Sequence, residues 1–510
     1  RSGLEFVGLR LGSNLGVLHD LVLLGQQMAV NLANAGIIGA SILLGALLAL
    51  IVFVFRPRPK NAPPSVKLGA PVIGNIQAFI KSPLGLIKNC YEKYGPVYTV
   101  PMMGKNLTFL IGPDAQAPFF RLKDDDLSQN EVYGFMKPVF GPNVVYDAEP
   151  KKRNYQMQQM ANGLRAARLK SYIPKIIKET VEYLDAKWGE SGEVDILDAL
   201  SELTILTSSR CLHGDDVRET LFAEVSRLYH DLDKGITPIS FFLPNLPIAA
   251  HKKRNKARKE MIALFSKVIA ERRARGDTSE TNTDILQIFM DMQYKDGTKP
   301  TDEEITGLLI ALLFAGQHTS SITSTWTTLY LLQHPEFLAR ARKEMQQVAG
   351  RRDDFDFEAT QKMDFLTHCI REALRLQPPL IMLMRYAKRA LRIDAGGKQF
   401  TIPKGDIVFT SPAVGHRLPE VFPEPDSFNP DRYAAGREEH KQPFAFLGFG
   451  GGMHACMGQN FGYMQVKTIM TVLLRRYDLE LAGPFPEPDY TAMVVGPKEG
   501  TCKVRYSRRK

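Results

Sequence analysis

A short glycine-rich stretch in the last quarter of the chain places the strongest constraint on its fold. Residues 449–458 read FGGGMHACMG, with the thiol of Cys456 between glycines and two residues after His454. Glycine tolerates positive φ and lets the backbone approach a flat ligand closely. A helix is expected from Cys456 to about Arg476, and its positive N-terminal end would lower the pKa of the thiol. The pattern predicts a loop that presents a thiolate as a metal ligand; a buried cysteine in a tight turn is the alternative.

Three further motifs precede this loop. Residues 315–320 read AGQHTS inside a long apolar stretch, Glu372 and Arg375 form an E-x-x-R pair, and residues 428–433 read FNPDRY. Each motif alone is weak evidence. All four in this order resemble the cytochrome P450 superfamily of haem-thiolate monooxygenases, and the resemblance spans about residues 60–510.

The resemblance implies a set of residues that bind the cofactor, haem b. Cys456 is expected to be the axial iron ligand, with Gly450 and Gly452 shaping the loop around it. Glu372 and Arg375 lie one turn apart on one helix face and can pair. In the family they join the arginine matched here by Arg432 and lock the region behind the cysteine loop, so their expected role is structural.

The AGQHTS segment implies both an activity and a narrower family. Gly316 in a helix interior costs about 1 kcal/mol relative to alanine, so a small residue is expected to be needed there. Thr319 can donate its hydroxyl to a carbonyl one turn earlier, and in the family it helps deliver protons to iron-bound oxygen. His318 stands where most members have an acid, which resembles the sterol 14α-demethylases. Histidine can relay protons near neutral pH; a solvent-facing histidine on a packed helix is the alternative.

Other segments match residues that the resemblance assigns to the haem propionates and to the substrate. Tyr133, Tyr146, Arg385 and His454 match the propionate contacts, and a phenol or a base is a suitable partner for a buried carboxylate. An ordinary packed aromatic is the alternative for each tyrosine. The residues matched to the sterol cavity are Phe135, Phe140, Ala315 and Met493.

Some positions depart from the family pattern. Met453 and Ala455 stand where animal and fungal members have arginines, and a lysine expected shortly after Tyr146 is replaced. These departures affect the expected propionate anchoring and the charge that faces a reductase. Phe135 resembles plant and trypanosomatid forms, which indicates a sterol with one rather than two methyl groups at C4.

The N-terminal part of the chain contains a predicted membrane segment. Residues 21–55 carry no charge, and residues 36–55 are nearly all apolar and long enough to cross a bilayer as a helix. The basic residues that follow at once predict a cytosolic location for the rest of the chain. We therefore expect a single-pass protein of the endoplasmic reticulum, with an N-terminal lumenal or amphipathic segment (1–35), a proline-rich linker (56–68) and a catalytic domain (69–510). A cleaved signal peptide fits less well, because no small-residue cleavage site follows.

Composition and charge limit the classes of partner that the chain is expected to bind. The net charge of +10 suits an anionic membrane surface or an acidic protein partner, and no nucleic-acid fold signature accompanies it. The five cysteines show no disulfide or zinc spacing, which favours a reducing compartment. No dinucleotide or flavin fingerprint occurs, so electrons from NADPH are expected to arrive through a separate NADPH–cytochrome P450 reductase. The expected partners are thus a sterol, this reductase and the bilayer, without nucleic acid.

We expect a mainly α fold with a minor β portion, a cytochrome P450 fold preceded by one transmembrane helix. Thr301 to Glu304 form a capping box that predicts the start of a helix running to about Gln333. The helix with Glu372 should stop at Pro378. Strand-like runs occur at 97–101, 107–111, 399–408 and 502–506.

The expected function is removal of the 14α-methyl group of a sterol precursor by three successive oxygenations. Formate would leave and a C14–C15 double bond would form, as the resemblance implies. A microsomal monooxygenase that acts on another lipid is one alternative. A non-catalytic haem-bearing protein that binds sterols is the other, and the presence of Thr319 argues against it.

Overall fold

The computed structural model describes residue 45 and residues 58–68, 73–102, 104–241, 243–280, 282–350, 354–437 and 439–510. The predicted membrane segment 36–55 lies outside the described residues except for residue 45, and the N-terminal segment 1–35 lies wholly outside them. The described chain is mostly helical, with three small sheets. This confirms the expected mainly α fold with a minor β portion.

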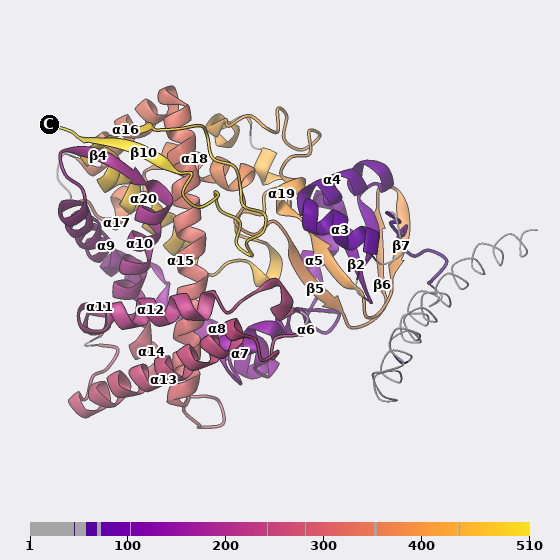
Figure 1. The fold of residues 1–510 in the computed structure, drawn as a ribbon, viewed down its shortest axis with the longest axis horizontal. Helices are drawn as coiled ribbons and strands as arrows, with labels where there is room; N and C mark the ends of the chain where they lie inside the picture. The colour runs from indigo at the N-terminus through magenta and orange to yellow at the C-terminus, as the bar shows by residue number, and fades with distance from the viewer. Residues whose placement is uncertain are drawn as a thin grey trace, which may run out of the picture.

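Most helices form one large part of the molecule (Figure 1). They are α8 (Pro150–Gly163), α9 (Ala166–Lys187), α10 (Ile196–Ser208), α11 (Asp215–Thr220), α12 (Phe222–Asp233), α13 (Ala249–Arg275), α14 (Ile285–Asp291), α15 (Asp302–Gln333), α16 (Pro335–Ala349), α17 (Phe357–Gln361), α18 (Asp364–Leu376) and α20 (Gln459–Arg476). A π-helical turn, η3 (Ser209–His213), continues α10. The long helix α15 runs through the middle and packs against α10, α13, α18 and α20.

Helix α15 is the core helix that the capping box predicted. The Thr301 hydroxyl accepts the Glu304 N–H and the Glu304 carboxylate accepts the Thr301 N–H, each at 3.2 Å. It is the one helix in the described part of the chain that is long and apolar enough to cross a membrane, but 72% of its apolar window is buried inside the protein. Its hydropathy therefore reflects burial in the core.

A five-stranded sheet forms the second part of the molecule, on the right in Figure 1. Its order is β1 (Val97–Met102), β2 (Lys105–Leu110), β8 (Ile407–Thr410), β5 (Leu383–Ala387) and β3 (Leu127–Ser128). Strands β2 and β8 are parallel and the other pairs antiparallel. Helices α3 (Ile73–Lys81) and α4 (Pro83–Tyr94) pack on β1, while α5 (Pro113–Arg121) packs near β2 and β8.

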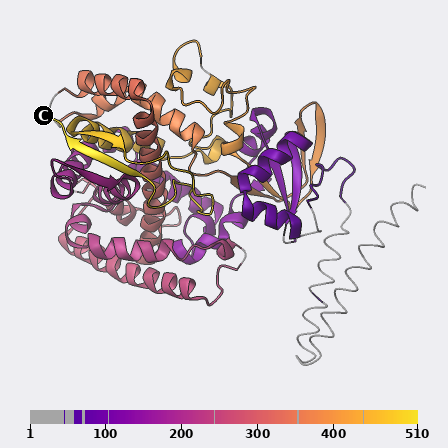
Figure 2. The same ribbon diagram turned by 45° about the horizontal axis from the view of Figure 1, so that its top comes forward.

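Two smaller sheets and several short helical turns complete the described chain. Strands β6 (Leu391–Ala395) and β7 (Lys398–Ile402) form a hairpin, and β4 (Ser191–Asp195), β10 (Lys503–Arg508) and β9 (Tyr477–Leu481) form a three-stranded sheet. Strand β10 lies at the opposite end of the molecule from α3 and α4 in both views (Figures 1 and 2). The short turns are α6 (Asn130–Tyr133), η1 (Gly134–Met136), α7 (Lys137–Phe140), η2 (Val145–Asp147), η4 (Pro238–Phe241), α19 (Pro412–Gly415), η5 (Pro430–Tyr433), η6 (Glu439–Lys441) and η7 (Gly452–His454).

Two expected elements need correction. The run 399–408 is not one strand, because Gly405 adopts φ +94° in the turn that separates β7 from β8. The helix expected from Cys456 begins three residues later, at Gln459. The N–H of Cys456 instead donates to the carbonyl of Phe449 at 2.9 Å, which holds the cysteine in the loop.

Candidate functional site

The cysteine loop takes its shape from two glycines with left-handed backbone. Gly450 has φ +69° and Gly452 has φ +65°. A Cβ on Gly452 would lie 2.0 Å from the carbonyl oxygen of Phe120, so only glycine lets this loop approach the end of α5. The loop thus packs closely against α5 and leads to Cys456, while its close approach to a flat ligand stays a prediction.

The electrostatics of Cys456 differ from the expectation. The residue is exposed by area, whereas the other four cysteines are buried. Protein atoms around the sulfur raise the pKa of the Cys456 thiol by desolvation, and the N–H of Gly458 lowers it in part. The net direction is opposite to the predicted one, because desolvation outweighs the lowering by Gly458, the N-cap of α20. A bound metal ion would itself deprotonate the thiol.

Helix α15 presents the AGQHTS residues at its centre. The hydroxyl of Thr319 donates to the carbonyl of Ala315 at 2.6 Å, as the sequence predicted. Ala315 is exposed and Thr319 is half-buried, whereas Gln317 and Ser320 on the same turns of α15 are buried. A Cβ on Gly316 would meet only the hydroxyl of Ser208, at 3.8 Å. Within the described chain, steric contact therefore does not require glycine at this position.

His318 faces helix α12. Its Nε2 lies 3.1 Å from Oδ1 of Asp233, at the C-terminal end of α12. The neighbouring Gln317 accepts a hydrogen bond of 2.9 Å from the hydroxyl of Tyr229, also on α12. The sequence did not reveal Asp233 or Tyr229, because only the fold brings α12 against α15.

The two tyrosines matched to the haem propionates lie together. Tyr133 and Tyr146 stack with ring centroids 4.8 Å apart. Burial raises the pKa of both phenols, so each remains a hydroxyl that can donate a hydrogen bond. The structure therefore brings both tyrosines to one place and keeps them suited to an anionic partner.

Of the two basic residues matched to the propionates, Arg385 contacts the last turn of α5 and His454 contacts the segment after it. Arg385 is 2% exposed, and its Nη1 donates to the carbonyl of Phe119 at 2.7 Å. Burial lowers the pKa of Arg385 to about 10, so the guanidinium stays charged near neutral pH. Its Nε is buried without a hydrogen-bond partner in the described chain. The Nε2 of His454 lies 2.7 Å from Oδ1 of Asp124.

Asp124 also accepts a hydrogen bond from Arg153 of α8, which the sequence analysis missed. Burial alone would raise the pKa of Asp124, but its bonds to His454 and Arg153 lower the pKa below its usual value. The only sequence signal for these two residues is a run of acids at 124–126 and a run of bases at 151–153. Neither run indicates which of its members turns inward.

Two of the four residues matched to the substrate cavity are buried aromatic residues. Phe135 and Phe140 are each 6% exposed. Phe135 packs against Phe241 with centroids 5.7 Å apart, and Phe140 contacts Phe314 of α15 edge-on at 6.0 Å. Met493 is 49% exposed, on the segment between β9 and β10.

The expected triad of Glu372, Arg375 and Arg432 is present and fully buried. Glu372 receives two bonds from Arg375, at 2.8 and 2.9 Å, and one from Arg432 at 2.9 Å. The Asn429 N–H and the Tyr433 hydroxyl also donate to Glu372. The remaining guanidinium donors reach backbone carbonyls between residues 416 and 427. These contacts fix the segment that leads into the cysteine loop.

These residues fit haem. The loop offers one thiol, the phenols and Arg385 offer donors suited to carboxylates, and the unpartnered Nε of Arg385 is a buried donor that an anion would satisfy. No cluster of three or more His, Cys, Asp or Glu side chains that could hold a separate metal ion occurs among the described residues.

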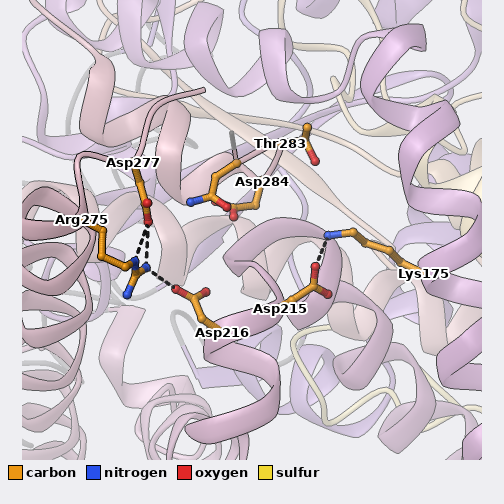
Figure 3. A pocket seen from close by; sticks show the side chains of 8 residues that line it. Lys175, Asp215, Asp216, Arg275, Asp277, Thr283 and Asp284 are labelled. Atoms are coloured by element: carbon orange, nitrogen blue, oxygen red, sulfur yellow. Dashed lines mark hydrogen bonds and ion pairs between the residues drawn. The ribbon is translucent and has the colours of Figure 1, made fainter. Parts of the chain in front are cut away.

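A polar surface cavity of about 280 Å³ lies elsewhere, near the C-terminal end of α13 (Figure 3). The charges that line it are paired: Arg275 pairs with Asp277 and Asp216, and Lys175 pairs with Asp215. Asp284 pairs with Arg272, which lies outside the lining. None of the residues predicted from the sequence lines this cavity. It is therefore separate from the candidate site.

Comparison with known proteins shows which family the chain is similar to. The cytochrome P450 family model matches residues 63–504. The chain is 50% identical over 452 residues to the obtusifoliol 14-alpha demethylase of Triticum aestivum, which covers 88% of this chain and 99% of that protein. It is 46% identical to the sterol 14-demethylase of Arabidopsis thaliana (94% and 98% covered) and 40% identical to the lanosterol 14-alpha demethylase of Mus musculus (95% and 97%). Its fold is similar to that of the retinoic-acid-bound cyanobacterial CYP120A1, with a TM-score of 0.77 at 24% identity, covering 89% of this chain and 100% of that one.

Proposed function

Because the chain belongs to the cytochrome P450 family, we propose that it is a sterol 14α-demethylase. It is a haem-thiolate monooxygenase, with haem b as cofactor and with electrons from NADPH through a separate reductase. The observation that carries the narrower proposal is the AGQHTS segment on α15, with His318 in place of the usual acid. The names of the relatives at 40–50% identity support the same reaction.

Cys456 is the proposed iron ligand, and Gly450 and Gly452 give its loop the required shape. When bound, haem supplies the activation of O₂ for insertion into a C–H bond of the 14α-methyl group. Three such oxygenations release this carbon as formate and leave a C14–C15 double bond. Tyr133, Tyr146, Arg385 and His454 are the proposed contacts of the two haem carboxylates.

The protons for the reaction pass along helix α15 in this proposal. Thr319 holds its hydroxyl on the carbonyl of Ala315, at the half-buried centre of the helix. Nε2 of His318 lies 3.1 Å from Oδ1 of Asp233 without the alignment of a hydrogen bond, and histidine is the residue type suited to relay a proton between α15 and α12. Thr319→Ala is expected to keep the haem spectrum and sterol binding but to lower turnover by about 10- to 100-fold.

The sterol is proposed to lie against Phe135, Phe140, Ala315 and Met493. An aromatic ring at Phe135 occupies space beside Tyr133, with centroids 6.2 Å apart, and beside Phe241. This bulk favours a sterol with one methyl group at C4 over a sterol with two. Glu372, Arg375 and Arg432 have a structural role, because they fix the cysteine loop without facing the substrate.

The chain is proposed to be anchored in the endoplasmic reticulum membrane by residues 36–55. The lack of any charge between residues 21 and 55 supports this anchor, and the basic residues after it support a cytosolic catalytic domain (69–510) beyond the linker 56–68. The reductase would approach this domain from the cytosol. A sterol dissolved in the bilayer would reach the site without leaving the membrane surface.

The test is a spectral titration of the purified protein followed by turnover with NADPH and a reductase. A C4-monomethyl sterol is expected to shift the Soret band from low to high spin and to yield its 14-desmethyl product, more strongly than a C4-dimethyl sterol. A normal ferrous-carbonyl thiolate spectrum without any sterol response would refute the demethylase and keep the haem-thiolate protein. Turnover of a fatty acid but no sterol would support a monooxygenase of another lipid.

A further inference from the structure

Residues 119–124, which begin in the last turn of α5 and which we call the α5 bracket, contact both basic residues proposed for the haem carboxylates, Arg385 and His454. The carbonyl of Phe119 accepts from Arg385 at 2.7 Å, and Phe120 lies against the backbone of Gly452. Asp124, the last residue of the bracket, contacts both His454 and Arg153. Its Oδ1 lies 2.7 Å from Nε2 of His454, and its Oδ2 accepts a hydrogen bond from Arg153.

From this geometry we propose that Asp124 is a positioning residue for the cofactor, which orients His454 and Arg153 toward the haem carboxylates. The proposal rests on the haem-thiolate assignment and not on the choice of sterol. Asp124 acts through the two basic side chains rather than by contact with substrate. Its carboxylate joins three elements that are distant in sequence: the α5 bracket, the cysteine loop and α8.

The partners of Asp124 show why this carboxylate is needed. The side chains of Arg153 and His454 are 8% and 17% exposed, so water solvates them poorly. Arg153 also donates to Asn130, and Arg385 lies nearby as a further buried cation. Buried charges of one sign repel unless a counter-charge is fixed among them. A fixed carboxylate lets Arg153 and Arg385 remain close to each other, and as a hydrogen-bond partner of Nε2 it sets the orientation of the His454 ring.

The two aspartates that follow Asp124 in the chain have different surroundings from it. Asp126 bonds the exposed side chain of Arg389, and Asp125 is exposed. Only Asp124 of the three turns toward the cysteine loop. Asp126→Asn is therefore a matched control, because it removes the same charge from the same turn without touching His454 or Arg153.

The test measures the cofactor rather than turnover. Asp124→Asn has the same shape as the native side chain but removes the charge. We expect the purified holoprotein of this variant to lose haem to apomyoglobin about 10-fold faster than the native protein, and its reduction potential to shift to more positive values. Asp126→Asn should match the native protein in both measurements. Asp124→Glu, which restores the charge, should recover most of the potential and part of the haem retention.

A double variant separates positioning from general destabilisation. If Asp124 acts through His454, then Asp124→Asn combined with His454→Gln should lose haem little faster than His454→Gln alone. Fully additive effects would overturn the proposal, as would an Asp124→Asn variant that matches Asp126→Asn in both haem loss and potential. These measurements need no sterol, so they can fail while the proposed demethylase activity holds, and the reverse.

Discussion

The side chain of His416 shows how one buried residue couples two distant segments. The N–H of Leu447 donates to Nε2 of His416 at 2.7 Å, and Nδ1 lies 3.1 Å from the carbonyl of Arg375. Because a backbone N–H donates to Nε2, that atom carries a lone pair and Nδ1 carries the proton. His416 thus joins the end of α18 to the segment before the cysteine loop as a neutral imidazole.

This neutral state predicts a defined loss of stability in acid. Burial lowers the pKa of His416 to about 3, whereas an unfolded histidine has a pKa near 6.5. The unfolded chain therefore binds one more proton between these values, and the free energy of unfolding falls as pH decreases through this window, by about 1.4 kcal/mol per pH unit at its steepest. Thermal unfolding measured between pH 7.5 and 4.5 should show this dependence.

Replacing His416 by glutamine isolates its contribution to the pH dependence of the free energy of unfolding. His416→Gln should be less stable than the native protein at pH 7.5 but should lose less stability on acidification. His334→Gln, at a half-exposed histidine, should follow the native pH dependence. Equal pH dependence in the native protein and His416→Gln would contradict the assignment of a neutral buried imidazole.

Lys467 predicts a pH dependence of the same sign in the alkaline range. It is 4% exposed, its Nζ donates to the carbonyl of Thr360 at 2.6 Å, and burial lowers its pKa to about 8. The folded chain therefore loses this proton at lower pH than the unfolded chain does. Between about pH 8 and 10.5, Lys467 should add on the order of 2–3 kcal/mol to the free energy of unfolding, a gain that is lost again as pH falls.

A comparison of the native protein with Lys467→Met measures the contribution of Lys467 to the free energy of unfolding. The difference between their thermal midpoints should change in favour of the native protein as pH rises from 7 to 10, since other groups titrate in both proteins alike. A constant difference would mean that Lys467 remains protonated throughout.

Single residues differ in how far the sequence could predict their partners. Glu372 and Arg375 are three positions apart on a helix, so local geometry alone predicts their contact. Asp124 and His454 are 330 positions apart, and no periodicity or spacing relates them. The same limit applies to Asp233 beside His318. Partners within one turn of helix are predictable, whereas partners across elements required the fold.

At the scale of elements, the ends of helices were predictable where their signals are local. Helix α15 begins after its capping box and ends before His334, which precedes proline. The start of α20 was not predictable, because the bond from Cys456 N–H to Phe449 closes a loop whose geometry depends on Gly450 and Gly452 together. The split between β7 and β8 likewise depends on one turn at Gly405.

The capping box gives a prediction for α15. Thr301→Ala removes the acceptor for the Glu304 N–H and should lower the free energy of unfolding by about 1 kcal/mol. Glu304 also pairs with Lys152 of α8, so the loss should loosen the contact between the two helices. Thermal unfolding of the holoprotein measures the effect. Thr220→Ala, at an exposed position at the end of α11, is the control and should change stability by less than about 0.5 kcal/mol. Equal midpoints for both variants would show that the cap contributes nothing.

At the scale of the whole molecule, the residues that follow the proposed membrane segment are paired with the sheet. The N–H of Val66 donates to Thr99 at 2.8 Å and that of Thr99 to Pro64 at 2.9 Å, while the N–H of Thr401 donates to Asn61 at 2.8 Å. Residues 61–66 therefore lie alongside both β1 and β7 and form backbone hydrogen bonds with them. The sequence predicted a stiff proline-rich linker but gave no sign of these strand-like contacts.

An ion pair fixes the start of this linker. Arg58 donates to the hydroxyl of Thr99 at 3.0 Å and lies 3.5 Å from Asp406, which is 2% exposed. Asp406 also accepts from Thr108 at 2.8 Å and from Asn106 at 3.2 Å. A membrane anchor joined to so constrained a linker would have little freedom to turn relative to the catalytic domain.

Asp406→Ala should release the linker from the sheet. The variant leaves the Thr108 hydroxyl and Arg58 without this acceptor, and we expect a loss of about 2–3 kcal/mol in the free energy of unfolding. Trypsin should then cleave after Lys60 and Lys67 several-fold faster and release the catalytic domain from membranes. Asp426→Ala is the control, because its pair with Arg417 is exposed. If both variants are cleaved at the native rate, the contacts of Asp406 do not restrain the linker, and the orientation of the domain on the membrane must depend on other surfaces.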